Sequence, residues 1–91
     1  MIAKALAAAR LERLVGRSVW PGDLEDFVGA ALDAEVTVET EDGDDGREVV
    51  YATTATEPMQ RFGFADVKLV CKPKAGGRLF VEAAEIIGWE F

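Results

Sequence analysis

The sequence predicts an α+β fold in which two N-terminal helices are packed on one face of a four- to five-stranded antiparallel sheet. Apolar residues recur at helical spacing over the first third of the chain and at every second position afterwards. Gly, Pro and Asp divide the later part into hairpins. Helices followed by hairpin-linked strands are typical of two-layer domains, and the 91 residues are expected to form a single small domain, residues 1–91.

Two helices are expected before the strands. Residues 2–15 are rich in the strong helix formers Ala, Leu and Arg, and the helix is expected to end at Gly16. The core side of this first helix is predicted to comprise Ala7, Ala8, Leu11, Leu14 and Val15. A second helix is expected to follow Asp23 as its N-cap and to end near Asp33, with Trp20 filling the space between helices and sheet. Its predicted core side comprises Leu24, Phe27, Val28, Ala31 and Leu32.

From Glu35 onward the apolar period is two, which predicts strands. Residues 35–39 and 48–54 form a first hairpin around a turn-rich loop at 41–46. Residues 66–72 and 78–83 form a second hairpin, and 85–91 continue the sheet after a bulge at Ala83 and Ala84. Residues 56–65 are either a connection or a short extra strand. Cys71 is in register with Val67 and Leu69, which predicts a core position.

The composition argues against catalysis. The chain has no His and one Cys, so neither an imidazole base nor a Ser–His or Cys–His pair is available. One thiolate is too few for a zinc site. The acidic loop lacks the EF-hand pattern, because Gly43 and Ala52 fall where acids are required when Gly46 takes the place of the invariant glycine. We therefore expect a non-enzymatic protein without a metal or other cofactor.

The sequence also favours a cytoplasmic protein. A lone cysteine is typical of reducing compartments. No apolar run approaches the roughly 18 residues of a membrane span, so no membrane partner is expected. Arg10, Glu12 and Arg13 interrupt the Ala-rich N-terminal segment before a secretory signal core forms.

The uneven distribution of charge is the main functional signal. Twelve of the seventeen acidic residues lie between Pro21 and Glu57, where Arg47 is the one base, and the net charge of the chain is −7. Such a block favours a cationic partner. We expect a small protein-interaction module that binds a basic protein stoichiometrically, as inhibitors, antitoxins, immunity proteins and phage anti-defence proteins do. The expected contact residues are Glu35, Glu39, Glu41, Asp42, Asp44 and Asp45.

A basic set around the second hairpin supports a different class of function. Lysine, arginine and phenylalanine side chains together form surfaces that bind single-stranded nucleic acid. The candidates are Lys68, Lys72, Lys74 and Arg78, with Phe62, Phe64 and Phe80. The pI near 4.5 opposes this alternative. The arginines of the first helix, Arg10, Arg13 and Arg17, are expected to pair with the acidic block instead.

The C-terminal segment supports a third class, a structural subunit. Residues 86–91 remain apolar to the last position, which predicts a strand that completes the core or an edge that pairs with another chain. In the second case Trp89 and Phe91 are the expected anchors of a homo-oligomer or of a larger assembly, such as that of a phage.

Overall fold

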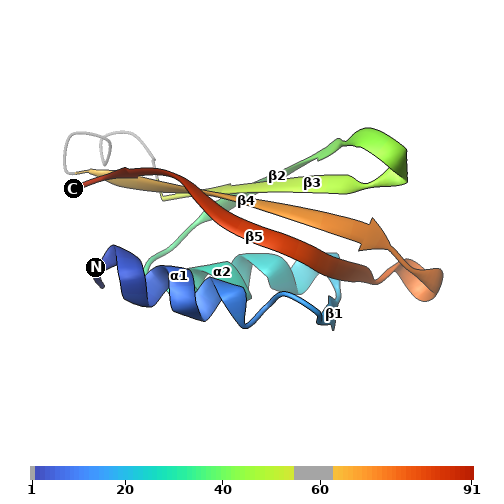
Figure 1. Ribbon diagram of the computed structural model, residues 1–91, viewed down its shortest axis with the longest axis horizontal. Helices are drawn as coiled ribbons and strands as arrows, with labels where there is room; N and C mark the ends of the chain where they lie inside the picture. The colour runs from blue at the N-terminus through green and yellow to red at the C-terminus, as the bar shows by residue number, and fades with distance from the viewer. Residues whose placement is uncertain (1, 55–62) are drawn as a thin grey trace.

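The computed structural model describes residues 2–54 and 63–91 of the chain. Two α-helices, five strands and three 3₁₀ turns (labelled η) follow one another there (Figure 1). Their bounds are α1 (Lys4–Glu12), β1 (Ser18–Val19), η1 (Pro21–Asp23), α2 (Leu24–Leu32), β2 (Thr37–Asp42), η2 (Asp44–Gly46), β3 (Glu48–Thr53), β4 (Phe64–Pro73), η4 (Ala75–Gly77) and β5 (Leu79–Glu90). Within these ranges, no helix is long and apolar enough to cross a membrane.

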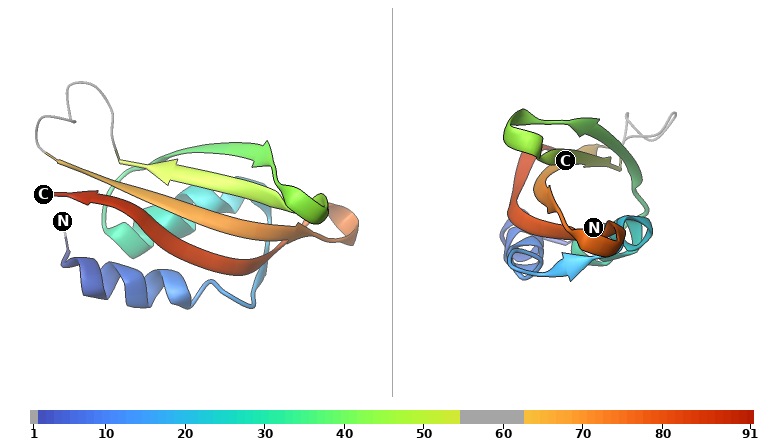
Figure 2. Two further views of the ribbon diagram at one scale, coloured as in Figure 1. Left: turned by 45° about the horizontal axis from the view of Figure 1, so that its top comes forward. Right: turned by 90° about the vertical axis from the view of Figure 1, so that its right-hand side faces the viewer.

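The five strands form one antiparallel sheet in the order β1-β5-β4-β3-β2. The predicted α+β class and antiparallel sheet are confirmed. The finer prediction, two helices packed on one face, is not confirmed, because the sheet curls into a half-barrel (Figure 2). α1 lies against β5 near one edge, and α2 contacts α1 and the opposite edge strand, β2. Strand twist and two register shifts between β4 and β5 account for the curl.

The core fills the space between the curled sheet and the helices. β3, β4 and β5 supply alternate residues to it, which confirms the predicted side of Val67, Leu69 and Cys71. The helices supply most of their predicted core residues, but Ala8 is exposed. The main buried side chains are Leu11, Leu14, Leu24, Val28 and Leu32 from the helical part and Val50, Val67, Leu69, Cys71, Leu79 and Val81 from the sheet.

Several strand boundaries differ from the prediction. β2 begins at Thr37 rather than Glu35 and continues to Asp42, so the loop of the first hairpin is shorter than expected. A backbone bond from Gly43 N to Arg47 O (2.8 Å) closes this loop. The short strand β1 was not predicted from the sequence. It pairs with β5, where Ser18 lies opposite Phe80. The extra strand considered at 56–65 falls largely outside the described residues; Phe64 and Ala65 belong to β4.

The predicted N-cap position of α2, Asp23, is confirmed, but the expected capping hydrogen bond is absent. Asp23 precedes the helix, but its side chain makes no capping hydrogen bond. The reason is its backbone, with φ −91° and ψ −11°, which is helical rather than extended as an N-cap requires. η1 leads directly into α2, so the chain enters the helix through a 3₁₀ turn.

Candidate protein-binding surface

β2 is an edge of the sheet and carries much of the acidic block. It pairs with β3 on one side, and its other side has no strand partner among residues 2–54 and 63–91. Val36 and Val38 face the core. Alternation along the strand therefore directs the side chains of Glu39 and Glu41 to the helix-free side of the sheet.

The structure distributes the six predicted contact residues over this edge and the adjoining turn. Glu35 precedes β2, Glu39 and Glu41 lie within it, and Asp42 ends it. The other two, Asp44 and Asp45, form η2, where Asp45 adopts a left-handed backbone with φ 56°. All six side chains are exposed. The carboxylates therefore lie at the surface along β2 and the turn that follows it.

Arg47, the one base within the acidic block, forms its ion pair with a residue outside that block. The guanidinium of Arg47 forms an ion pair with Glu82 of β5, including a 3.2 Å bond from Nη2, and this partner raises the pKa of Arg47. Its Nη1 donates to the backbone oxygen of Asp45 at 3.0 Å. Across the described part of the chain this is the one ion pair within 4 Å. The edge carboxylates are therefore not neutralised by an ion pair there.

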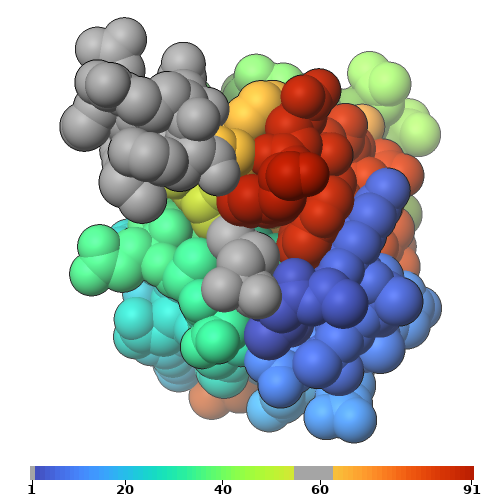
Figure 3. Space-filling view, turned by 90° about the vertical axis from the view of Figure 1, so that its left-hand side faces the viewer, coloured from blue at the N-terminus to red at the C-terminus, as the bar shows by residue number. Residues whose placement is uncertain are grey.

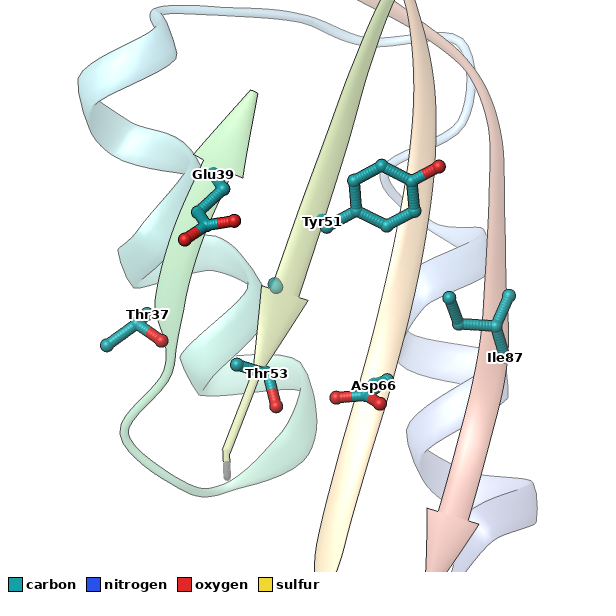
Figure 4. A pocket seen from close by; sticks show the side chains of 7 residues that line it. Thr37, Glu39, Tyr51, Thr53, Asp66 and Ile87 are labelled. Atoms are coloured by element: carbon teal, nitrogen blue, oxygen red, sulfur yellow. The ribbon is translucent and has the colours of Figure 1, made fainter. Parts of the chain in front are cut away.

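A shallow depression of about 250 Å³ lies beside β2 on the helix-free side of the sheet. Figure 4 shows carboxylates at two of its walls, Glu39 from β2 and Asp66 from β4, with the ring of Tyr51 and the side chain of Ile87. Its remaining lining residues are Thr37, Ala52 and Thr53. Acidic groups beside aromatic and aliphatic surface suit the charged head and apolar stem of a lysine or arginine.

Sequence reasoning did not assign Asp66 to this surface. Asp66 belongs to β4 and reaches the depression because it pairs with Thr53 of β3, which in turn pairs with Thr37 of β2. Asp66 could be assigned to this surface only from the register of the three strands, because the charge pattern along the sequence does not show which strands are paired.

The predicted nucleic-acid set is divided by the fold. Lys68 lies in the middle of β4, opposite Tyr51 and Glu85, whereas Lys72, Lys74 and Arg78 lie at or beside the turn to β5. Phe64 is at the other end of β4, and Phe62 lies outside the described residues. Phe80 lies close to the basic residues of the turn between β4 and β5, because the Lys74 ammonium is 5.4 Å from the centre of the Phe80 ring.

Trp20 belongs to the same basic region rather than to the interior. The prediction that it fills the space between helices and sheet is wrong, because its side chain is 48% exposed. The Arg78 guanidinium lies 4.7 Å from the centre of the Trp20 ring. Exposure is favoured because η1 begins directly after Trp20 and turns the chain at the surface.

Arg10 in the last turn of α1, and Arg13 and Arg17 beyond its end, are not paired with the acidic block as expected. Arg10 donates to the backbone oxygen of Ala30 at 3.5 Å, and the Arg17 guanidinium lies 5.6 Å from the centre of the Phe27 ring. No ion pair of Arg10, Arg13 or Arg17 with an acid is found among the described residues. These cations remain available at the surface.

The C-terminal aromatic residues have different environments. Trp89 is half-buried and packs against the core, whereas Phe91 is 59% exposed and contacts Trp89 edge to face at 5.1 Å. Figure 3 shows the C-terminal residues beside α1 at this end of the molecule. The structure thus places Trp89 within the domain's own packing and leaves Phe91 as an exposed residue.

The thiol of Cys71, the one cysteine of the chain, lies in the core. Cys71 is fully buried, and burial, with smaller contributions from Glu48 and Glu82, raises its thiol pKa from 9.0 to about 11. Such a thiol is a poor nucleophile at neutral pH. Over the described ranges, no group of three or more potential metal ligands comes together.

Comparisons with protein-family models, with curated proteins and with solved structures found no significant match for this chain.

Proposed function

We propose that this protein is a non-enzymatic interaction module that binds a basic segment of a partner protein along the β2 edge. The observation that carries the proposal is the coincidence of an edge strand with carboxylates that have no ion-pair partner among the described residues. An edge strand offers backbone donors and acceptors to an extended segment. Carboxylates along the same edge attract a segment that carries lysine or arginine.

The depression at Glu39 and Asp66 supports the proposal by supplying a place for one cationic side chain. Its walls combine two carboxylates with the ring of Tyr51 and the aliphatic side chain of Ile87. A lysine or arginine that enters would be attracted by both carboxylates while its stem covers apolar surface. The partner segment would lie along β2 and place one side chain over β3.

A charge-neutral variant of the edge tests the proposal. Glu35→Gln, Glu39→Gln and Glu41→Gln remove three charges from the β2 edge. The control Glu12→Gln, Glu25→Gln and Asp26→Asn removes three exposed charges from the helices. Both variants and the wild type are used as baits in a host lysate at low and at moderate salt, and the bound proteins are identified and titrated.

The expected result is a basic protein that the wild type and the helix control retain and that the edge variant binds at least about tenfold more weakly, with salt reducing the affinity. Equal weakening by both variants would mean that net charge alone attracts the partner. Equal binding by all three proteins would place the contact elsewhere. Either outcome would contradict the proposal.

A further inference from the structure

One end of the molecule displays three cations that aromatic rings hold in place. Arg78 lies over Trp20, Lys74 over Phe80 and Arg17 over Phe27, at 4.7, 5.4 and 5.6 Å from the ring centres. We call Arg17, Lys74, Arg78 and Trp20 the basic corner. β1 and β5 bring its parts together, because Ser18 and Val19 pair with Phe80 and Leu79.

The cations of the basic corner are ordered but not neutralised. In the chain as described, none of the three forms an ion pair with an acid. An aromatic ring attracts a cation without accepting all of its N–H hydrogen bonds, so donors remain for an anionic ligand. Two of these cations, Lys74 and Arg78, flank one short turn, η4, with one on each side. The surface therefore suits carboxylates or phosphates presented by another molecule.

The acidic turn η2 lies at the same end of the molecule. Figure 1 places η2 and η4 at the end opposite the chain termini, with β1 set back from them in the same half of the molecule, and the right-hand view of Figure 2 shows η2 and η4 at different corners of that end. Asp44 and Asp45 of η2, here called the acidic corner, are exposed. The nearby Arg47 does not neutralise them with an ion pair, because Glu82 is its partner.

We propose that two copies of this chain associate end to end through a two-fold axis, so that the acidic corner of each meets the basic corner of the other. A two-fold axis lying in the plane of this end exchanges its two corners, and each copy then faces charge of the opposite sign twice. The proposal does not depend on partner binding at β2, because its acidic contacts are Asp44 and Asp45 of η2, whereas the proposed function is tested at Glu35, Glu39 and Glu41.

The charge arrangement favours a second copy over a nucleic acid. A phosphodiester strand on the basic corner would be repelled by Asp44 and Asp45 at the same end. A second copy places a base opposite those acids as well. The molecule extends 24 Å and 20 Å along its two shorter axes, so its end offers at most roughly 500 Å² per copy, against the roughly 800 Å² of a standard interface. The dimer is therefore weak and sensitive to salt.

Sedimentation equilibrium of a charge-swapped pair tests the dimer. In the first variant Asp44→Lys and Asp45→Asn reverse the acidic corner, and asparagine keeps the left-handed backbone at position 45 acceptable. In the second variant Arg78→Glu and Lys74→Gln abolish the net positive charge of the basic corner, in which Arg17 remains. A control, Glu25→Lys with Asp26→Asn, changes the net charge as the first variant does but lies on α2.

At low ionic strength and up to about 1 mM protein, the wild type and the control are expected to rise from the 9.8 kDa monomer toward the dimer and to dissociate in about 0.5 M salt. Each swapped variant alone should associate at least about tenfold more weakly, and an equimolar mixture should recover a 1:1 complex. Circular dichroism checks that each variant is folded.

Three outcomes would overturn the proposal. The first is a wild type that stays monomeric under these conditions. The second is a mixture that fails to associate or that forms species longer than a dimer, which would exclude the two-fold arrangement. The third is binding of an oligothymidylate by the wild type that the Arg78→Glu, Lys74→Gln variant loses, without any dimer, because the basic corner would then serve nucleic acid. Loss of a basic partner at β2 in a separate assay bears on the proposed function alone.

Discussion

Raising the pH ionises thiols, and in this protein the affected thiol, that of Cys71, lies in the core between the sheet and the helices. Its pKa of about 11 in the folded chain exceeds the ordinary value of 9.0. The unfolded chain therefore loses this proton first as the pH rises. Below pH 9.0 the thiol is neutral in both states and its favourable burial is fully retained; toward pH 11 that contribution is lost.

The size of the effect follows from the separation of the two pKa values. At about pH 10, one unit above 9.0, the unfolded thiol is mostly ionised and the folded thiol mostly neutral. The free energy of unfolding should then be about 1.4 kcal/mol lower than at neutral pH on account of this group alone. The limiting loss at higher pH is about 2.7 kcal/mol for a difference of about two units.

Urea unfolding followed by tryptophan fluorescence measures this loss. The wild type, Cys71→Ala and Val67→Ala are each unfolded at about pH 7 and at about pH 10. Val67 is as buried as Cys71 and faces the same core, so Val67→Ala controls for the removal of core volume. All other ionisable groups are common to the three proteins, so the difference between their pH effects isolates the thiol.

The expected result is that Cys71→Ala loses about 1.4 kcal/mol less stability on alkalinisation than the wild type, while Val67→Ala loses as much as the wild type. If Cys71→Ala and the wild type lose the same amount of stability, burial does not hold the thiol neutral in the folded chain, which would contradict the prediction.

Two further predictions concern matched pairs of residues. Leu69→Ala should lower the free energy of unfolding by about 2–5 kcal/mol because Leu69 is fully buried, whereas Leu6→Ala, at a 45% exposed site on α1, should change it by less than about 0.5 kcal/mol. Gly29→Ala should destabilise by roughly 1 kcal/mol or more despite the better helix propensity of alanine, because the new Cβ would lie 2.9 Å from the backbone oxygen of Ala34. Gly22→Ala should change the free energy of unfolding very little, because the space around Gly22 is open. Thermal unfolding of the four variants checks both pairs. A Gly29→Ala variant more stable than the wild type would contradict the glycine prediction.

The spacing of apolar residues in the sequence was sufficient to predict the helices and strands that bury one regular face. α2 runs from Leu24 to Leu32, close to the predicted bounds, because its apolar spacing coincides with one buried side. Cys71 was correctly assigned to the core for the same reason, since strand alternation continues from Val67 through Leu69. These predictions succeed because one periodicity determines both the conformation and the buried face.

Elements defined by pairing with distant residues could not be predicted in this way. β1 has two residues, Ser18 and Val19, and is a strand because β5 lies beside it. Glu41 and Asp42 extend β2 although both are poor strand formers, because an edge in contact with water tolerates their charge.

The candidate surfaces were predicted in part. The exposed acids from Glu35 to Asp45 could be identified because they are close in sequence. Asp66 joins Glu39 only through the register of three strands, and Trp20 meets Arg78 only through the pairing of β1 with β5. Proximity created by sheet topology has no local signal in the sequence.

The pairing of β1 with β5 also affects the order in which the protein can fold. Roughly 60 residues separate Ser18 from its partner Phe80, so closing this contact carries the entropy cost of a long loop. During synthesis β1 has no strand to join until β5 has left the ribosome, whereas the β2–β3 hairpin can form as soon as both strands are free. The core beneath the helices is therefore complete only after β5 has paired with β1. We expect this late contact between distant parts of the chain to limit the rate of folding.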